Sequence, residues 1–292
     1  MKKIVIGLIS MAFATPLVAQ APPRMTADEV IAHYIKTVGG MDKIQAVKTL
    51  RRVGKYTGGG GFEATFVQEN KRPDFVREEF SLQGMTGINA WNGKTGWKID
   101  PFGGKKDPEA LSEDEMRGIV EDADFDEPLV NYREKGNKVE LVGMDQIEGT
   151  DVYKLRLTLK SGDVRTYYMD TDTFVPIRMD EKRTIRGTEQ ETETNLGNYK
   201  EVAGWFMPFA IESGAKGQDK GKITFDHIDA NGPIDDSRFA KPMIGAATQP
   251  AGDALDAAKK LPKKEPEKTT PVKPPVTPPP PPPPPSTSKE IR

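Results

Sequence analysis

The alternation of apolar and polar residues divides the chain into a helical start and a long series of strands. Thr26 and Glu29 have the spacing of a capping box, in which an N-cap threonine precedes a glutamate by three residues. An apolar stripe at helical spacing follows, made of Val30, Ile31, Tyr34, Ile35 and Val38. Gly39-Gly40 is typical of a helix end. The pattern therefore predicts a first helix here and a second, shorter one over residues 41–47.

From residue 50 the apolar period changes to two, which predicts strands. Their expected ranges are 50–56, 62–69, 75–82, 87–91, 96–99, 138–146, 152–160, 164–169, 174–182, 189–196, 205–213 and 222–229. Asn92-Gly93, between Trp91 and Trp97, is the strongest hairpin signal in the chain. Short turns favour antiparallel pairing, because parallel strands need long crossovers. Residues 107–130 interrupt the series with a second capping box at Ser112 and Glu115. We therefore expect an α+β fold, with one large antiparallel sheet and two helical insertions.

Both ends of the chain differ from this pattern. Residues 1–21 have the basic start, short apolar run and small residues of a signal peptide, with cleavage expected near residues 19–21. A buried N-terminal helix is the alternative, but Pro22-Pro23 would end it at once. Residues 245–292 are basic and proline-rich, and their composition predicts a disordered, extended tail. The folded domain is expected to cover residues 25–244.

Composition narrows the class of protein. There is no cysteine, which excludes disulfides and a lipid-modified cysteine at the cleavage site. No later apolar segment is long enough to cross a membrane. We expect a soluble, exported protein located in the periplasm. The central part of the chain carries a net charge of −9, which argues against nucleic acid as a partner. The basic tail could contact an anionic surface of the cell envelope.

Sequence signatures of catalysis are not found. The chain lacks a nucleophile elbow, a phosphate-binding loop and a dinucleotide fingerprint. Asp122, Asp124 and Asp126 have the first spacings of a calcium loop, but Glu127 occupies the position that requires glycine. We expect no metal, no cofactor and no enzymatic activity. A hydrolase remains an alternative that requires a deeply buried pair of carboxylates in a cavity.

Two segments resemble the LolA-like periplasmic carriers, the outer-membrane lipoprotein-sorting family. Residues 67–80 contain a strand that ends in Arg72-Pro73, and residues 91–101 contain the hairpin Asn-Gly-Lys-Thr-Gly-Trp with an Ile-Asp-Pro exit. Residues 234–239 also resemble the end of many such proteins. The resemblance implies an incomplete β-barrel covered by helices, with an apolar cavity for acyl chains. Its implied partner is a lipid or an acylated lipoprotein, passed between membrane-associated donor and acceptor proteins.

The resemblance also implies roles for individual residues. The arginine before the proline, here Arg72, would bond to a helical lid and hold it closed. Residues 107–130 are the candidate lid by position. Aromatic side chains of the predicted strands could line the cavity or simply fill the core. They are Phe66, Phe75, Phe80, Trp91, Trp97, Tyr153 and Tyr168. The faces on which the two tryptophans lie stay open at this point, because the turn between them breaks the alternation.

The same fold also serves protein-binding modules. The alternative function is therefore a non-enzymatic interaction or sensor module, in which the proline-rich tail reaches a partner or the cell wall.

Overall fold

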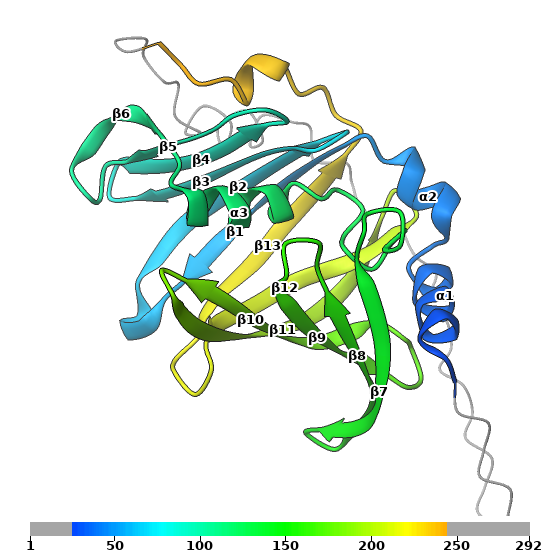
Figure 1. Ribbon diagram of the computed structural model, residues 1–292. Coiled ribbons are helices and arrows are strands. Elements are labelled where there is room, and N and C mark those ends of the chain that lie inside the picture. Colours follow the sequence, from blue (N-terminus) through cyan, green and yellow to red (C-terminus); the bar gives the residue numbers. More distant parts are fainter. Residues whose placement is uncertain (1–24, 244–292) are drawn as a thin grey trace, which may run out of the picture. The chain divides into compact units, whose positions relative to one another are not determined.

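The computed structural model describes residues 25–243, so the predicted signal peptide and proline-rich tail lie outside the described residues. Within this range, thirteen strands form one antiparallel sheet in the order β6-β5-β4-β3-β2-β1-β13-β12-β11-β10-β9-β8-β7. Figure 1 shows that the sheet does not close. We call β1–β6 the N-terminal wing and β7–β13 the C-terminal wing. The expected α+β fold with an incomplete antiparallel barrel and covering helices is confirmed.

The two N-terminal helices begin and end as the sequence predicts. Helix α1 covers Ala27–Thr37, and both bonds of its capping box are present: Thr26 accepts from the Glu29 amide, and Glu29 accepts from the Thr26 amide. Helix α2 covers Met41–Ala46 and follows Gly40, whose φ of 87° suits glycine. The apolar side of these helices packs on the sheet.

The N-terminal wing is a meander of hairpins. Its elements are β1 (Thr49–Thr57), the short helix η1 (Gly59–Gly61), β2 (Glu63–Lys71), β3 (Phe75–Leu82), β4 (Met85–Asn92), β5 (Gly96–Asp100) and β6 (Lys105–Ala110). In the β4–β5 turn, the Asn92 side chain accepts from the amides of Lys94 at 3.0 Å and Thr95 at 2.8 Å. Gly93 follows with a φ of 81°. The predicted hairpin is thus fixed by local chemistry alone.

Strand β6 was not among the predicted strands. Its sequence contains two lysines, an aspartate and Pro108, and no apolar alternation. It pairs on one side only, with β5, and forms an edge of the sheet. An edge position tolerates proline because one side of the strand needs no partner. Apolar periodicity cannot detect a strand of this kind.

Helix α3 (Glu113–Asp122) separates the wings along the chain, and its predicted capping box at Ser112 and Glu115 is formed. The C-terminal wing follows as a second meander. Its strands are β7 (Lys138–Ile147), β8 (Thr150–Thr158), β9 (Val164–Asp170), β10 (Pro176–Ile185), β11 (Thr188–Val202), β12 (Trp205–Ala215) and β13 (Gly221–Ala230). A short helix, η2 (Asp236–Arg238), comes last.

The wings meet where the first strand pairs with the last, from Leu50 opposite Ala230 to Thr57 opposite Lys222. The largest buried apolar cluster joins α1, α2 and residues 125–132 to the C-terminal wing and to the β1–β13 joint. It therefore forms between the helices and one face of the sheet, which we call the concave face. No helix in residues 25–243 is long and apolar enough to span a membrane.

Candidate functional site

Helix α3 lies across the concave face of the sheet (Figure 1). Its buried contact with the N-terminal wing is apolar, and one partly exposed ion pair, between Lys98 and Glu115, lies beside it. Ile119, which is 5% exposed, and the fully buried Ala123 pack on Val76 of β3. Trp91, Leu111 and Met116 surround this contact. Removal of these side chains from water holds α3 against β3 and β4.

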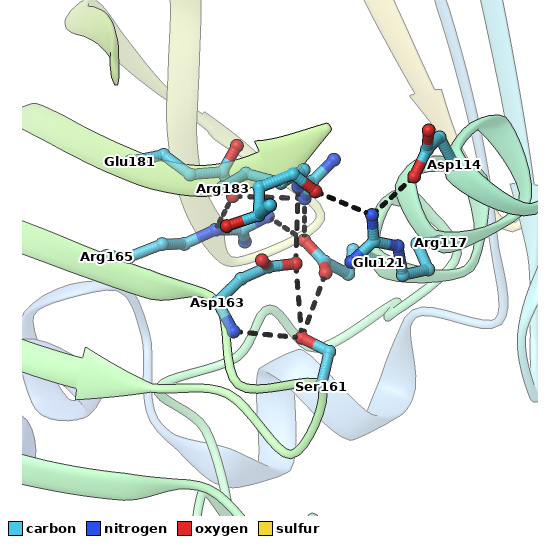
Figure 2. A network of polar contacts seen from close by, with 9 residues as sticks. Asp114, Arg117, Glu121, Ser161, Asp163, Arg165, Glu181 and Arg183 are labelled. Atoms are coloured by element: carbon cyan, nitrogen blue, oxygen red, sulfur yellow. Dashed lines mark hydrogen bonds and ion pairs between the residues drawn. The ribbon is translucent and has the colours of Figure 1, made fainter. Parts of the chain in front are cut away.

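The contact of α3 with the C-terminal wing is ionic, and we call it the clamp. It consists of Glu121 of α3, Arg165 of β9, and Glu181 and Arg183 of β10 (Figure 2). Glu121 Oε2 accepts from the guanidinium groups of both arginines. Arg165 Nε donates to Glu181 Oε1 at 2.7 Å. The side chains of Glu121 and Arg165 are only 12% and 11% exposed, so the clamp is largely screened from water.

Further polar groups surround the clamp. Asp163 Oδ2 lies 3.3 Å from Arg183 Nε. Arg117 of α3 donates to the carbonyl of Thr184 at 2.8 Å and pairs with Asp114 (Figure 2). Three carboxylates, those of Glu121, Glu181 and Asp163, therefore face the two arginines of the clamp. Acidic charge is in excess there.

The pKa values of Glu121 and Arg165 are both raised, for different reasons. Burial raises the pKa of Glu121 to about 6, although Arg165 and Arg183 act against this rise. Burial by itself lowers the pKa of Arg165, but Tyr167, Glu181 and Glu121 outweigh it and raise that pKa above its usual value. The surroundings therefore favour the charge of Arg165 strongly, while they disfavour the charge of Glu121.

A hollow of about 260 Å³ lies on the concave face beside the clamp. One part of its lining is apolar and includes Phe125, Met179, Leu196, Trp205, Met207, Ile211 and Phe225. The other part is polar and includes Arg52, Gln68, Asn70, Glu121, Asp122 and Arg165. The expected cavity was apolar, whereas the observed lining is amphiphilic.

The polar part of the lining is a connected row on β1 and β2 that continues to Glu78 of β3, outside the hollow. Arg52 donates to Gln68 Oε1 at 2.8 Å and to Asn70 Oδ1 at 2.6 Å. Gln68 in turn donates to Glu78 Oε1 at 2.8 Å. Burial lowers the pKa of Arg52 to about 10. Burial raises the pKa of Glu78. Crowding by the surrounding protein and the charge of Glu78 raise the pKa of Asp122, and the rise is limited because the Asp122 side chain is exposed on one side.

No family model matches the chain, and no curated protein matches it. Solved structures do. A DUF1329 family protein from Desulfovibrio piger matches with a TM-score of 0.52 and 14% identity, over 73% of this chain and 96% of the other. A LolA superfamily protein from Nitrosomonas europaea matches with a TM-score of 0.50 and 13% identity, over 75% of this chain and 99% of the other.

A protein domain from Vibrio parahaemolyticus, named for outer-membrane lipoprotein sorting, has a TM-score of 0.50 and 11% identity, over 73% of this chain and 95% of its own. The fold is LolA-like. At these identities the likeness establishes the architecture and leaves the ligand open.

In this LolA-like fold, Arg72 lies between α2 and the segment after α3. It donates from Nη1 to Asp126 Oδ2 at 2.9 Å, from Nε to the carbonyl of Val47 at 2.8 Å, and from Nη2 to the carbonyl of Ile44 at 2.9 Å. Its guanidinium carbon lies 4.4 Å from the centre of the Phe125 ring. Arg72 therefore contacts the turn that follows α3, within residues 107–130, and its role as a lid lock stays a prediction.

Four of the seven aromatic residues predicted to line the cavity lie on the concave face. Phe66 and Phe80 line a second pocket of about 440 Å³, on the N-terminal wing. Trp91 packs beneath α3. Tyr153 packs against the main core, with its ring centre 5.9 Å from that of Phe174. None of the four lines the hollow itself, although Phe66 contacts Phe225, which does.

The other three lie on the opposite, convex face, and the structure does not bring them to the hollow. Trp97 Nε1 donates to the carbonyl of Phe239 at 2.8 Å, and the Phe75 ring lies 5.3 Å from the Phe239 ring. Tyr168 donates to Asp180 at 3.1 Å. Trp91 and Trp97 therefore lie on opposite faces, because Trp97 pairs with Ala90, the residue beside Trp91.

Three of the four acidic residues considered for calcium have separate partners. Asp124 pairs with Lys135, Asp126 with Arg72, and the hydroxyl of Tyr34 donates to Glu127 at 3.4 Å. Residues 25–243 contain no group of three or more histidine, cysteine, aspartate or glutamate side chains that could hold a metal ion.

Sequence reasoning missed the clamp. Its two arginines belong to strands more than 40 positions beyond α3, so no local pattern joins them to Glu121. A partial signal exists in the strands themselves. In β9 and β10, Arg165, Glu181 and Arg183 occupy positions on the same face as Tyr167 and Met179. Charged residues on a face that also carries buried apolar residues indicate an ionic contact across that face.

Proposed function

We propose that this LolA-like protein binds a lipid, or the acyl chain of a lipoprotein, in the hollow beneath α3, and that it carries this ligand in the periplasm. The observation that carries the proposal is the amphiphilic lining of the hollow. Its apolar side suits an acyl chain, and its row of hydrogen-bonding groups suits the polar group at the end of that chain. The structural likeness to a domain named for lipoprotein sorting supports the proposal.

The volume of the hollow implies that α3 must move. Pockets that enclose small ligands usually measure about 300–1,000 Å³, and the hollow measures about 260 Å³. A long acyl chain would not fit unless the lid opened. In the proposed mechanism, the Arg72–Asp126 contact and the clamp hold α3 closed, and binding of the chain displaces them.

Two variants of one strand test the site. Leu196 lines the hollow, whereas its neighbour Asn195 points to the opposite face of β11. Leu196→Trp fills the hollow and should abolish binding of a fluorescent fatty acid. Asn195→Trp adds the same side chain outside it and should bind like the unchanged protein. Equal affinities of both variants, or protein purified from cells that yields no extractable lipid and binds no fatty acid, contradicts the proposal.

A hydrolase is the second candidate, because Asp122 at the hollow and Glu78 in the second pocket are two carboxyl groups with raised pKa. Such a pair can divide acid and base roles. The unchanged protein should then cleave acyl esters of p-nitrophenol, and Asp122→Asn should lose that activity. Absence of turnover by the unchanged protein over a broad pH range excludes this candidate. The interaction-module hypothesis concerns the tail, which lies outside the described residues.

A further inference from the structure

Three exposed apolar side chains gather at one end of the N-terminal wing. Phe62 precedes β2, Met85 begins β4, and Phe102 lies in the turn after β5; they are 44%, 40% and 43% exposed. In an up-and-down meander these three connections lie at the same end of the strands. We call Phe62, Met85 and Phe102 the apolar rim.

The rim continues inward as a row of rings. Phe62 lies 5.8 Å from Tyr56, Tyr56 lies 5.4 Å from Phe80, and Phe80 lies 5.7 Å from Phe102, measured between ring centres. Tyr56, Phe80 and Phe102 line the second pocket, together with Phe66.

The row reaches the hollow at its inner end. The Phe66 ring lies 6.2 Å from that of Phe225, which lines the hollow. A path lined by aromatic rings therefore runs along the concave face from solvent, through the second pocket of about 440 Å³, to the hollow. The lining of the second pocket also includes the charged residues Glu78, Lys98, Asp100 and Glu115.

Two glycines bring the rings of the rim close to the main chain. Phe62 packs against Gly58, where a Cβ atom would lie 2.3 Å from the ring. Phe102 packs over Gly87, where a Cβ atom would lie 3.1 Å from the ring. Glycine at both positions lets the rings lie flat on the main chain with their outer edges exposed.

We infer that the apolar rim inserts into the surface of a lipid bilayer, from which the ligand enters the path. The inference rests on the proposed function of the hollow. A bilayer is favoured over a protein partner because three side chains at turn tips are far less than the roughly 800 Å² per partner that a stable protein interface buries. Apolar tips can instead enter the interfacial region of the membrane singly.

The charges near the rim agree with this occupant. Lys105 and Lys106 follow Phe102 closely and are exposed, so their long side chains can reach lipid phosphates while the ring inserts. Lys55 lies 3.7 Å from Glu63 and Lys105 lies 3.9 Å from Glu109, which weakens the attraction. The inserted apolar side chains therefore account for most of the binding to the bilayer, and anionic lipid strengthens that binding only modestly.

The test uses two sets of exposed side chains. The rim variant is Phe62→Ser, Met85→Ser and Phe102→Ser combined. The control variant is Val142→Ser and Met144→Ser, which changes exposed apolar residues of β7. Binding is measured by flotation with vesicles of phosphatidylethanolamine and phosphatidylglycerol. We expect the rim variant to lose about tenfold or more in vesicle affinity, because each side chain contributes apolar area to insertion. The control variant should bind like the unchanged protein. Equal binding by all three, or equal loss in both variants, overturns the inference.

A second measurement avoids the combined substitution. The chain has no cysteine, so a single introduced cysteine takes up one fluorophore. A polarity-sensitive dye on Phe102→Cys should shift to the blue on addition of vesicles, and the same dye on Met144→Cys should not. No shift at either position overturns the inference.

The two proposals fail in different ways. A fluorescent fatty acid added from solution reaches the hollow without a vesicle, so the rim variant should retain that binding. Fatty-acid binding without vesicle binding leaves the hollow as proposed and removes the rim. Rim-dependent vesicle binding without fatty-acid binding keeps the rim and removes the proposed ligand.

Discussion

The two wings of the sheet hold α3 by different kinds of contact. On the N-terminal wing, Ile119 packs on Val76 in an apolar contact that has no strict direction. On the C-terminal wing, Glu121 meets two arginines in a buried ionic contact that depends on geometry and protonation. Apolar contacts tolerate small rotations, whereas charged hydrogen bonds do not. If α3 opens as proposed, we therefore expect it to pivot on the N-terminal wing and to release from the C-terminal wing.

The largest loss of stability should follow substitution of Arg165. Arg165→Met leaves the carboxylates of Glu121 and Glu181 buried beside a side chain that cannot neutralise them. We expect a loss of about 3–5 kcal/mol in the free energy of unfolding, measured by urea denaturation. Arg156→Met, which removes a half-exposed arginine from β8, is the control and should change stability little. A loss below about 1 kcal/mol for Arg165→Met would mean that the clamp is not buried in solution.

The second-largest loss of stability should come from the apolar contact of α3 with the N-terminal wing. Ile119→Ala removes buried methyl groups between α3 and β3 and should cost about 2–3 kcal/mol. Hydrogen exchange of the α3 amides reports this loss locally. Val120→Ala alters an exposed neighbour in the same helix and should leave exchange nearly unchanged. If α3 opens no faster in Ile119→Ala than in Val120→Ala, the N-terminal wing is not the pivot.

The clamp should also respond to pH. The pKa of Glu121 is about 6 with α3 closed, against about 4.5 when α3 is open and the carboxyl is in water. A raised pKa means that the closed state binds the proton more tightly. This stabilisation of closure is complete below about pH 4.5 and is lost as the pH rises through about 6. It amounts to about 2 kcal/mol at most.

Exchange of the α3 amides, corrected for the intrinsic rate, should therefore show easier opening at pH 7 than at pH 5. The raised pKa values of Glu78, Asp122 and Glu127 act in the same direction. Glu121→Gln removes the contribution of Glu121 and should flatten the profile. An unchanged profile in this variant assigns the pH response to the other three residues.

The smallest loss of stability should follow substitution of Lys98. It donates to Glu115 at 2.6 Å and forms an ionic link between α3 and the N-terminal wing. The Glu115 side chain is 41% exposed, so the pair contributes no more than about 1 kcal/mol. Lys98→Met should change thermal unfolding little, like the control Lys94→Met. A loss as large as that of Arg165→Met would end the distinction between the wings.

The sequence predicts what depends on neighbouring residues. The Asn92-Gly93 turn and the Thr26 and Ser112 capping boxes form from side chains within three positions of the backbone groups they bond. The sequence did not predict which side chains from distant parts of the chain meet in the fold. The concave or convex position of Trp91 and Trp97 follows from strand register, and the partners of Glu121 follow from the pairing of distant strands.

Arg72 shows the limit of resemblance. Its position before Pro73 indicated a contact with a lid, and a contact with Asp126 exists. The same residue also bonds to the carbonyls of Ile44 and Val47. Arg72 therefore joins the end of α2 to the lid segment, and it has structural partners that the motif alone did not indicate.

The pairing of β1 with β13 sets an order of assembly. Each wing can form by local hairpins, but the joint between them pairs residues 165 to 180 positions apart, from Thr57–Lys222 to Leu50–Ala230, the kind of distant contact that slows folding. The hollow spans this joint, since Arg52 comes from β1 and Phe225 from β13. The hollow is therefore complete only once the last strand of the sheet has paired with the first.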